Sequence, residues 1–226
     1  LEQSRALNEL VRGLAHEIKN PLGGLRGAAQ LLESELADPA LREYTSVIIE
    51  EADRLRALVD RLLGPSGLPR RERLNLHEVL EHVRTLVLAE GHLGLRIERD
   101  YDPSIPELEA DRDALVQAVL NIVRNAVEAL AGEGTIWLQT RTERQVTIGS
   151  VRHRLAASVR IIDNGPGVPE ALRERLFVPL VTGRAQGTGL GLAIAQNLVG
   201  RHGGIIEFES RPGHTCFNLL LPLEAS

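Results

Sequence analysis

Apolar residues at helical spacing dominate residues 1–63 and restrict this part of the chain to long amphipathic helices. One row recurs at steps of three, four or seven residues, the spacing of one helix face: Leu7, Leu10, Leu14, Ile18, Leu22, Leu25, Leu32 and Leu36. A second row has the same spacing: Tyr44, Val47, Ile48, Leu55, Leu58, Leu62 and Leu63. Between the rows, the segment ADPA contains Asp38 and Pro39, which favour a turn. The sequence therefore predicts two long helices joined by a short loop, an antiparallel hairpin.

This predicted hairpin has one wide apolar face and no segment of its own to cover it. If two copies pair through that face, they form a four-helix bundle, so we expect a homodimer. The alternative is that the face packs against the remainder of the same chain.

The segment GPSGLPRRER (64–73) is rich in Gly, Pro and Arg and has no periodicity, so it is predicted to be a linker between domains 1–63 and 74–226. Beyond it helices and strands alternate. Helices are expected at 76–90, 111–130 and 190–203. Strands are expected at 95–102, 134–143, 158–165, 205–210 and 215–223, with a hairpin or loop around 144–156. This order indicates an α+β sandwich with helices over one face of a sheet.

Composition excludes several classes of protein. The chain has 226 residues, 25% of them charged, and a net charge of -5, which gives no indication of nucleic-acid binding. Its one cysteine, Cys216, cannot form an internal disulfide, so we expect a cytoplasmic, reducing environment. No apolar run approaches the ~20 residues of a membrane helix. The chain begins with Leu and contains no Met, so we expect that it continues upstream in the full protein.

The stretch LAHEIKNPLGG (14–24) places a histidine just before a proline inside a predicted helix. At ~100° per residue, His16 points away from the apolar row, and Asn20 lies on the same face as His16. An exposed histidine can be phosphorylated, can bind metal or can have no role. Neutral imidazole is a good nucleophile near pH 7, and Glu17 could hold its other ring nitrogen. No second His or Cys lies on this face at the spacing of a zinc site. Pro21 predicts a bend that lets one helix face meet different partners, unless it is merely tolerated.

The helix at 111–130 carries Asn121 and Asn125 four residues apart on a narrow polar stripe. Any amphipathic helix has a polar face, but a stripe of carboxamides without lysine is less usual. Amide oxygens are suitable ligands for Mg²⁺ beside phosphate oxygens.

In IIDNGPGVP (161–169), a buried strand runs into Asp163, followed by Gly165 and Gly167. A carboxylate at a strand end can accept a hydrogen bond from an exocyclic amino group, and glycines let a planar ring approach the backbone. An ordinary turn with Asp-Asn at its start would look similar.

In GTGLGLA (187–193), Gly187, Gly189 and Gly191 open a helix, and exposed N–H groups at a helix N-terminus bind anions. The pattern is not a P-loop, because it lacks GxxxxGK[ST]. The preceding FVPLVTGRAQ is typical of a lid, from which Arg184 could reach a phosphate.

These motifs together resemble bacterial two-component sensor histidine kinases of the nitrogen-regulation type. HEIKNP resembles their H-box, NIVRNAVEA the N-box and DNGPGVP the first glycine box. LFVPL resembles the F-box and GTGLGLAIA the second glycine box, and all five occur in the family's order over nearly the whole chain. The resemblance implies a dimeric helical-hairpin four-helix bundle followed by a Bergerat-type α/β sandwich that binds ATP. It also implies that an N-terminal PAS sensor domain is absent from this sequence.

The resemblance assigns a role to each motif residue. His16 would be the phosphoacceptor and Glu17 its acid/base partner, and Asn20 would position water when the phosphorylated partner is dephosphorylated. Asn125 would ligate Mg²⁺ and Asn121 would line the phosphate site. Asp163 would accept from the adenine amino group. The remaining nucleotide residues would be Gly165, Gly167, Arg184, Gly187, Thr188, Gly189, Leu190, Gly191 and Thr215.

The implied reaction converts ATP and His16 into ADP and phosphohistidine and then transfers the phosphoryl group to an aspartate of a response regulator. By analogy the regulator would be NtrC-like, and a PII-type signal protein would shift the balance from kinase towards phosphatase. One residue departs from the family: Glu128 stands where many members have a basic residue. Arg184 or another basic residue of the lid or linker would have to compensate.

Two rival interpretations remain open. A different ATPase with the same nucleotide fold would lack the His16 hairpin and would release phosphate without forming a phosphoprotein. A non-enzymatic dimeric scaffold would bind nucleotide without autophosphorylation.

Overall fold

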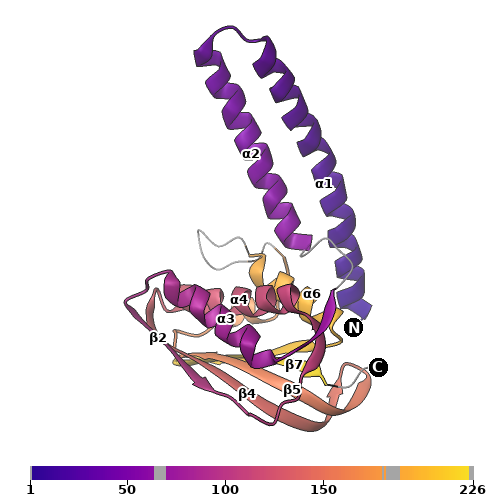
Figure 1. Ribbon diagram of the computed structural model, residues 1–226, viewed down its shortest axis with the longest axis vertical. Coiled ribbons are helices and arrows are strands. Elements are labelled where there is room, and N and C mark those ends of the chain that lie inside the picture. The colour runs from indigo at the N-terminus through magenta and orange to yellow at the C-terminus, as the bar shows by residue number, and fades with distance from the viewer. Residues whose placement is uncertain (1, 64–69, 180, 182–188, 224–226) are drawn as a thin grey trace. The chain divides into compact units, whose positions relative to one another are not determined.

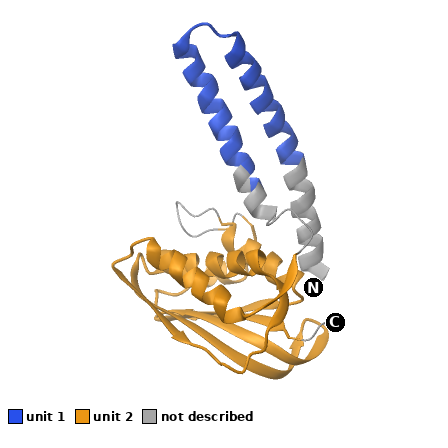
Figure 2. Cartoon of the chain, in the orientation of Figure 1, with its two compact units in different colours: residues 1–66 blue, residues 67–226 orange. Residues whose placement is uncertain are grey.

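The computed structural model describes residues 2–63, 70–179, 181 and 189–223, and within the helical hairpin it describes the side chains of 17–56 and of residue 59. The chain divides into two compact units, residues 1–66 and 67–226, each of which is treated separately (Figure 2). The division falls inside the segment 64–73 that the sequence analysis assigned to the linker, and the last three residues of that segment, 71–73, lie in a strand of the second unit.

Unit 1 is a pair of antiparallel helices, α1 (Glu2–Glu35) and α2 (Pro39–Leu63) (Figure 1). The turn lies where ADPA predicted it, since Asp38 accepts a hydrogen bond from the Ala40 N–H at 2.9 Å. Helix α1 continues through Pro21 without interruption.

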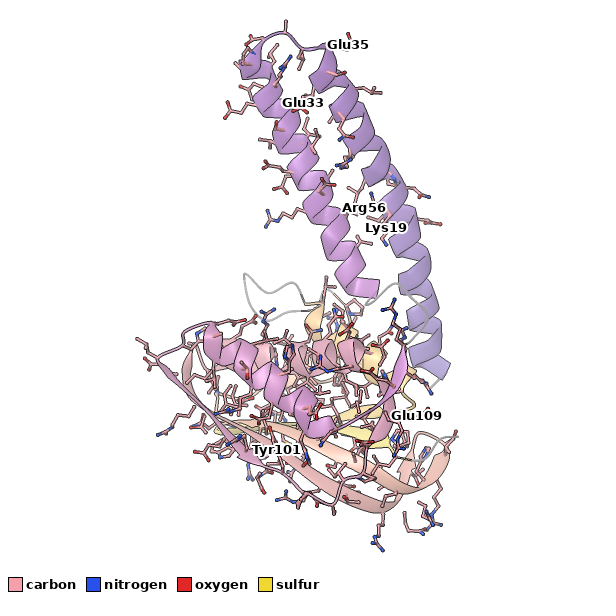
Figure 3. The ribbon with its side chains drawn as sticks, viewed as in Figure 1. Lys19, Glu33, Glu35, Arg56, Tyr101 and Glu109 are labelled. Atoms are coloured by element: carbon pink, nitrogen blue, oxygen red, sulfur yellow. The ribbon has the colours of Figure 1, made fainter. Side chains whose placement is uncertain are left out.

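Polar contacts hold the two helices of unit 1 in register. Arg26 of α1 forms an ion pair with Asp53 of α2 at 2.8 Å. Near the turn, the Ser46 hydroxyl donates to the Glu33 carboxylate at 2.9 Å, and Glu33 is labelled in Figure 3. Most described members of the two predicted apolar rows are exposed, among them Leu25 (57%) and Tyr44 (70%), whereas Leu22 is buried.

Unit 2 is an α/β sandwich in which α3, α4 and α6 lie over one face of a mixed sheet (Figure 1). The helices of this unit are α3 (Leu76–Ala89), α4 (Arg112–Ala129), α5 (Glu170–Arg173) and α6 (Gly191–Arg201). The strands of its main sheet are β2 (Gly94–Asp100), β4 (Glu133–Ile148), β5 (Val151–Asp163), β6 (Ile205–Arg211) and β7 (His214–Pro222). Their order is β2-β4-β5-β7-β6, and only the β2–β4 pair is parallel.

The core of unit 2 lies between this sheet and the helices. Alternate residues of β4, β5 and β7 point towards the helices and are almost fully buried, among them Leu138, Ile161 and Phe217. On the helix side, Leu80, Ile122 and Leu198 meet them with no more than 1% exposure. This dry interface fixes α4 and α6 against the sheet, and the same two helices carry predicted site residues.

One element of unit 2 was not predicted. Strands β1 (Arg71–Leu74) and β3 (Leu108–Asp111) form a separate antiparallel ribbon, in which Arg71 pairs with Asp111. The labelled Glu109 marks β3 in Figure 3. Of the two alternatives expected for 144–156, a hairpin or a loop, the structure has the hairpin, whose strands run on to a two-residue turn at 149–150.

Candidate functional site

The histidine stretch lies on helix α1. The backbone of His16 is helical, and its side chain lies outside the described part of the chain. Glu17 and Asn20 are exposed, whereas Leu22 is buried against the hairpin. Two of the three predicted phosphoacceptor-site residues are therefore accessible from solvent, and the described atoms do not test the orientation of His16.

The second site lies at the end of β5, where the strand runs into the turn DNGPG. Asp163 is only 2% exposed, and one of its carboxylate oxygens, Oδ1, accepts the Gly165 N–H at 2.9 Å. A Cβ on Gly165 would lie 2.7 Å from the same oxygen, so a side chain there would collide with the carboxylate. Gly165 is therefore required for Asp163 to keep this position.

The same turn is pressed against the connection between β6 and β7. Gly167 has a φ of +85°, and a Cβ on it would lie 3.0 Å from the backbone carbon of Arg211. The Gly213 N–H donates to the Gly165 carbonyl at 2.8 Å. Gly167 thus allows a close approach between two backbone segments, and the approach of a planar ring to this turn stays a prediction.

Thr215 stands beside Asp163, paired with it in the register of β5 and β7. Thr215 is 4% exposed, and its hydroxyl lies 3.0 Å from that of Ser210. The Ser210 Oγ also accepts the Val168 N–H at 2.8 Å. Ser210 therefore ties the glycine turn to Thr215. Ser210 was not among the predicted site residues, because a serine in a strand carries no motif signal.

Another polar residue that sequence reasoning did not assign is Asn164. Its side-chain oxygen accepts the Thr135 N–H at 2.9 Å and so links the turn to the start of β4. The sequence DNG did indicate a turn at this point, but the distant partner could not be read from local sequence.

Helix α4 brings the carboxamides to the same end of unit 2. The Nδ2 atom of Asn121 is buried and has no hydrogen-bond partner among the described residues. A buried amide without a partner costs free energy, which a ligand with an acceptor oxygen recovers. Asn125 lies one turn further along and is half-buried, and Glu128 lies exposed on the next turn.

Helix α6 begins opposite Asn121. A Cβ on Gly191 would lie 3.8 Å from that of Asn121, so the start of α6 packs directly against the middle of α4. Gly189 has a φ of +63°, a conformation that favours glycine, and Leu190 is buried and makes no side-chain cap. The N-terminus of α6, whose first N–H groups have no acceptor within the helix, therefore lies beside Asn121. Of the other residues predicted for this loop, Arg184, Gly187 and Thr188 lie outside the described residues.

Electrostatics argues against a role for the one thiol. Cys216 follows Thr215 on β7 and is buried, and this burial raises the pKa of its thiol. A protonated thiol is a poor nucleophile, so covalent cysteine chemistry is not expected here.

The arrangement suits a nucleotide. The buried Asp163 carboxylate, beside the closely packed Gly165 and Gly167, suits a hydrogen bond from an adenine amino group. Among the described residues, the Asn121 amide has no partner and α6 has no side-chain cap, so both offer donors for phosphate oxygens. The residues present therefore fit ATP, and Asn125 provides an amide oxygen that suits Mg²⁺. Within the described residues no cluster of three or more His, Cys, Asp or Glu side chains offers an alternative metal site.

Comparison with known proteins defines the class. Residues 6–66 match the family model of the His Kinase A (phospho-acceptor) domain. Residues 110–225, half of the chain, match that of the Histidine kinase-, DNA gyrase B-, and HSP90-like ATPase. The chain belongs to this ATPase family, and the preceding phospho-acceptor domain places it among the histidine kinases.

Within that class, the chain is similar to the Sensory histidine kinase/phosphatase NtrB of several bacteria. It is 58% identical to that of Vibrio alginolyticus over 223 residues and 59% identical to that of Escherichia coli O157:H7 over 222 residues. Both alignments cover 98% of this chain but 64% of the relative, so the chain spans about two thirds of the length of these proteins. The NtrB of Rhizobium leguminosarum bv. phaseoli is 42% identical over 227 residues, covering 97% of this chain and 59% of the relative.

Solved structures agree with this assignment. ShkA in complex with AMPPNP has a TM-score of 0.64 at 27% identity, covering 96% of this chain and 46% of that one. ThkA in complex with the response regulator protein TrrA has a TM-score of 0.60 at 29% identity, covering 99% of this chain and 64% of that one. The predicted family and the predicted combination of a helical hairpin with a Bergerat-type sandwich are therefore confirmed. Among the described helices, none is both long and apolar enough to cross a membrane.

Proposed function

We propose that the chain is the catalytic core of a sensor histidine kinase that phosphorylates His16 from Mg-ATP. The phosphoryl group then passes to an aspartate of an NtrC-like response regulator, and the same core dephosphorylates that regulator. The observation that carries the proposal is that one chain joins a phosphoacceptor-type hairpin to a nucleotide fold with a buried Asp163. The gyrase-like and HSP90-like ATPases share only the second part, so the hairpin favours the kinase.

In the proposed mechanism, residues 74–226 bind ATP and residues 1–63 provide the acceptor. Asp163 accepts a hydrogen bond from the adenine amino group while Gly165 and Gly167 admit the ring. Thr215 supports the adenine from β7. These contacts position the nucleotide, and positioning with charge neutralisation accounts for most catalysis of phosphoryl transfer.

The phosphates would lie between α4 and α6. Asn121 donates from its buried amide, and the backbone at Gly187, Thr188, Gly189, Leu190 and Gly191 frames the phosphate oxygens. Arg184 adds positive charge, which Glu128 cannot supply. When bound through Asn125, Mg²⁺ neutralises negative charge on the phosphates.

At the acceptor, one imidazole nitrogen of His16 forms a bond to the γ-phosphorus. The bond from that phosphorus to the β,γ-bridging oxygen breaks, and ADP leaves. Glu17 accepts the proton from the other ring nitrogen, which keeps the ring electron-rich during attack. In the phosphatase reaction, Asn20 orients the water that attacks the aspartyl phosphate of the regulator.

The proposal includes a homodimer formed through the exposed apolar row of α1 and α2, with residues 64–73 connecting it to the ATP-binding part. A PII-type signal protein would regulate the balance of the two activities, as the similarity to NtrB suggests. We place this activity in the cytoplasm, because the chain's one thiol has no disulfide partner in the chain.

Labelling with γ-labelled ATP and Mg²⁺ tests the proposal. Wild type should acquire an acid-labile, base-stable label, and His16→Gln should acquire none. The matched control is His82→Gln, which changes an exposed histidine on α3 and should label normally. ATP binding without label would favour a scaffold, and steady phosphate release without a phosphoprotein would favour another ATPase. Label on His16→Gln would mean that the nucleophile is a different residue.

A further inference from the structure

His202, at the C-terminal end of α6, is held by hydrogen bonds on both ring nitrogens. Its Nδ1 lies 2.8 Å from the Leu198 carbonyl oxygen, and its Nε2 lies 3.0 Å from the backbone nitrogen of Asp111. A carbonyl can only accept, so Nδ1 carries the proton and Nε2 accepts the Asp111 N–H. The ring is therefore a neutral bridge from α6 to Asp111.

Asp111 connects two further groups through its carboxylate. One oxygen accepts the Ala114 N–H at 3.0 Å and caps the N-terminus of α4. The other accepts the backbone N–H of Arg70 at 3.2 Å. Asp111 is 8% exposed, and its bond to Ala114 is buried while its bond to Arg70 is partly buried. A single side chain thus holds both the first turn of α4 and the first described residue after segment 64–69.

A second contact joins the same elements. The Arg71 guanidinium donates to the carbonyl of Arg201, the last residue of α6, at 3.1 Å. Arg71 is also the strand partner of Asp111 in the β1–β3 ribbon. The start of β1 is therefore attached to α4 through Asp111 and to α6 through Arg71.

The two attached helices carry the nucleotide residues of the proposed function. Helices α4 and α6 are antiparallel neighbours, because the C-terminus of α6 meets the N-terminus of α4 while Gly191 meets Asn121. Ten residues separate Asp111 from Asn121, roughly 15 Å along a helix. Helices α4 and α6 thus connect Asp111 and His202 to the phosphate end of the proposed site.

We propose that His202 and Asp111 are positioning residues, which couple the chain at the end of the linker to α4 and α6 and so to the nucleotide. The inference rests on the proposed function in one respect, that nucleotide binds between these helices. Because coupling between two sites is reciprocal, nucleotide binding should order residues 70–74, and the linker position should influence phosphoryl transfer.

Hydrogen exchange in the complete chain 1–226 tests this coupling. Exchange is compared with and without saturating AMPPNP and Mg²⁺ in wild type, His202→Ala, His202→Gln and Asp111→Asn. The Gln variant keeps a side-chain acceptor for the Asp111 N–H. The Asn variant keeps a capping oxygen for Ala114, but its amide nitrogen cannot accept from Arg70. Because Asp111→Asn retains the cap of α4, this variant tests the coupling even if His202→Ala does not fold.

In wild type, nucleotide should slow exchange of residues 70–74 roughly fivefold, the lower end of ordinary coupling between sites. This protection should disappear in His202→Ala and Asp111→Asn and return in His202→Gln. The matched control is Asn75→Ala, which removes the cap of α3 at the His77 N–H and should retain the protection.

Three results would overturn the coupling. Protection of 115–130 by nucleotide without any protection of 70–74 would contradict it while leaving the nucleotide site intact. Equal protection of 70–74 in wild type and both disrupting variants would show that other contacts transmit the effect. Loss of protection in both segments of wild type would contradict the nucleotide site itself, and the coupling with it.

Discussion

The two units differ in where their apolar side chains lie. In unit 2, Leu80, Ile122 and Leu198 are no more than 1% exposed between the helices and the sheet. In unit 1, Leu25, Ile48 and Leu55 are 46–57% exposed along one face of the hairpin. Unit 2 thus buries its apolar side chains within itself, whereas the described part of unit 1 leaves an apolar face exposed.

The difference indicates separate roles for the two units, nucleotide binding in unit 2 and association in unit 1. A self-contained sandwich can hold a nucleotide pocket in fixed geometry, because its site residues are supported by packed helices and strands. A hairpin with an uncovered face is completed by another surface, and a second copy provides one with matching apolar residues. A substitution can therefore affect one unit without the other. In unit 2 it should lower stability or ATP affinity, and in unit 1 it should weaken the dimer.

The largest effect is expected in the core of unit 2. Leu198→Ala removes a fully buried side chain from α6 and should lower the free energy of unfolding of that unit by about 2–5 kcal/mol. Leu25→Ala, in the exposed row of α1, should change stability little at low chain concentration. Urea unfolding of both variants at two concentrations makes the comparison. If both variants lost the same free energy of unfolding at both chain concentrations, the contrast between the units would be contradicted.

The second prediction concerns the exposed face. Ile48→Glu places a charge in the middle of the proposed dimer interface, where its burial is unfavourable, and should raise the dissociation constant of the dimer roughly hundredfold. The control Glu50→Lys alters charge on the same helix outside the apolar row. Sedimentation equilibrium measures both. A dimer of unchanged affinity in Ile48→Glu would place the interface elsewhere.

A smaller effect is expected in the turn after β5. Gly165→Ala adds a methyl group whose carbon lies 2.7 Å from the Asp163 carboxylate, so ATP affinity should fall about tenfold while the dimer is unaffected. Gly200→Ala is the matched control, since a Cβ there meets nothing within 4 Å. Titration with a fluorescent ATP analogue gives both constants, and unchanged affinity in Gly165→Ala would argue against adenine at this turn.

The smallest effect concerns pH. Burial lowers the pKa of His202 from its usual value of 6.5, and the nearby charges of Arg71, Asp111 and Arg201 also act on it. Burial lowers the pKa of His77 as well, against the opposing effect of Asp102. Since the unfolded chain takes up these protons at higher pH than the folded chain, stability should decrease as the pH falls below 6.5. The urea midpoint of unit 2 should show this decrease, and His202→Gln should weaken it. A midpoint that rises below pH 6.5 would contradict the argument.

Local sequence predicted the features with strong periodicity or turn chemistry. The leucine rows defined α1 and α2, and Asp38 with Pro39 marked their turn. The glycines after Asp163 and those before α6 marked two loops whose close packing is visible at Gly165 and Gly191. Such signals come from steric needs of single residues, so they are readable without the rest of the fold.

The features that were missed depend on partners far along the chain. Strand β1 lies in a stretch rich in Arg and Pro that has no strand pattern, and only its pairing with β3 makes it a strand. Asp111 was expected as part of a helix, but its bonds to Arg70 and His202 span 41 and 91 residues. The role of Ser210 likewise depends on Val168, 42 residues away. Contacts of this range follow from topology, which short motifs do not encode.

The most direct test of the whole account combines labelling with nucleotide binding in two variants, His16→Gln in unit 1 and Asp163→Asn in unit 2. The account predicts that neither variant incorporates label from γ-labelled ATP, that His16→Gln still binds ATP as tightly as wild type, and that Asp163→Asn binds it far more weakly. Label on residues 67–226, or normal labelling of Asp163→Asn, would contradict the division between a nucleotide-binding unit and a phosphoacceptor unit.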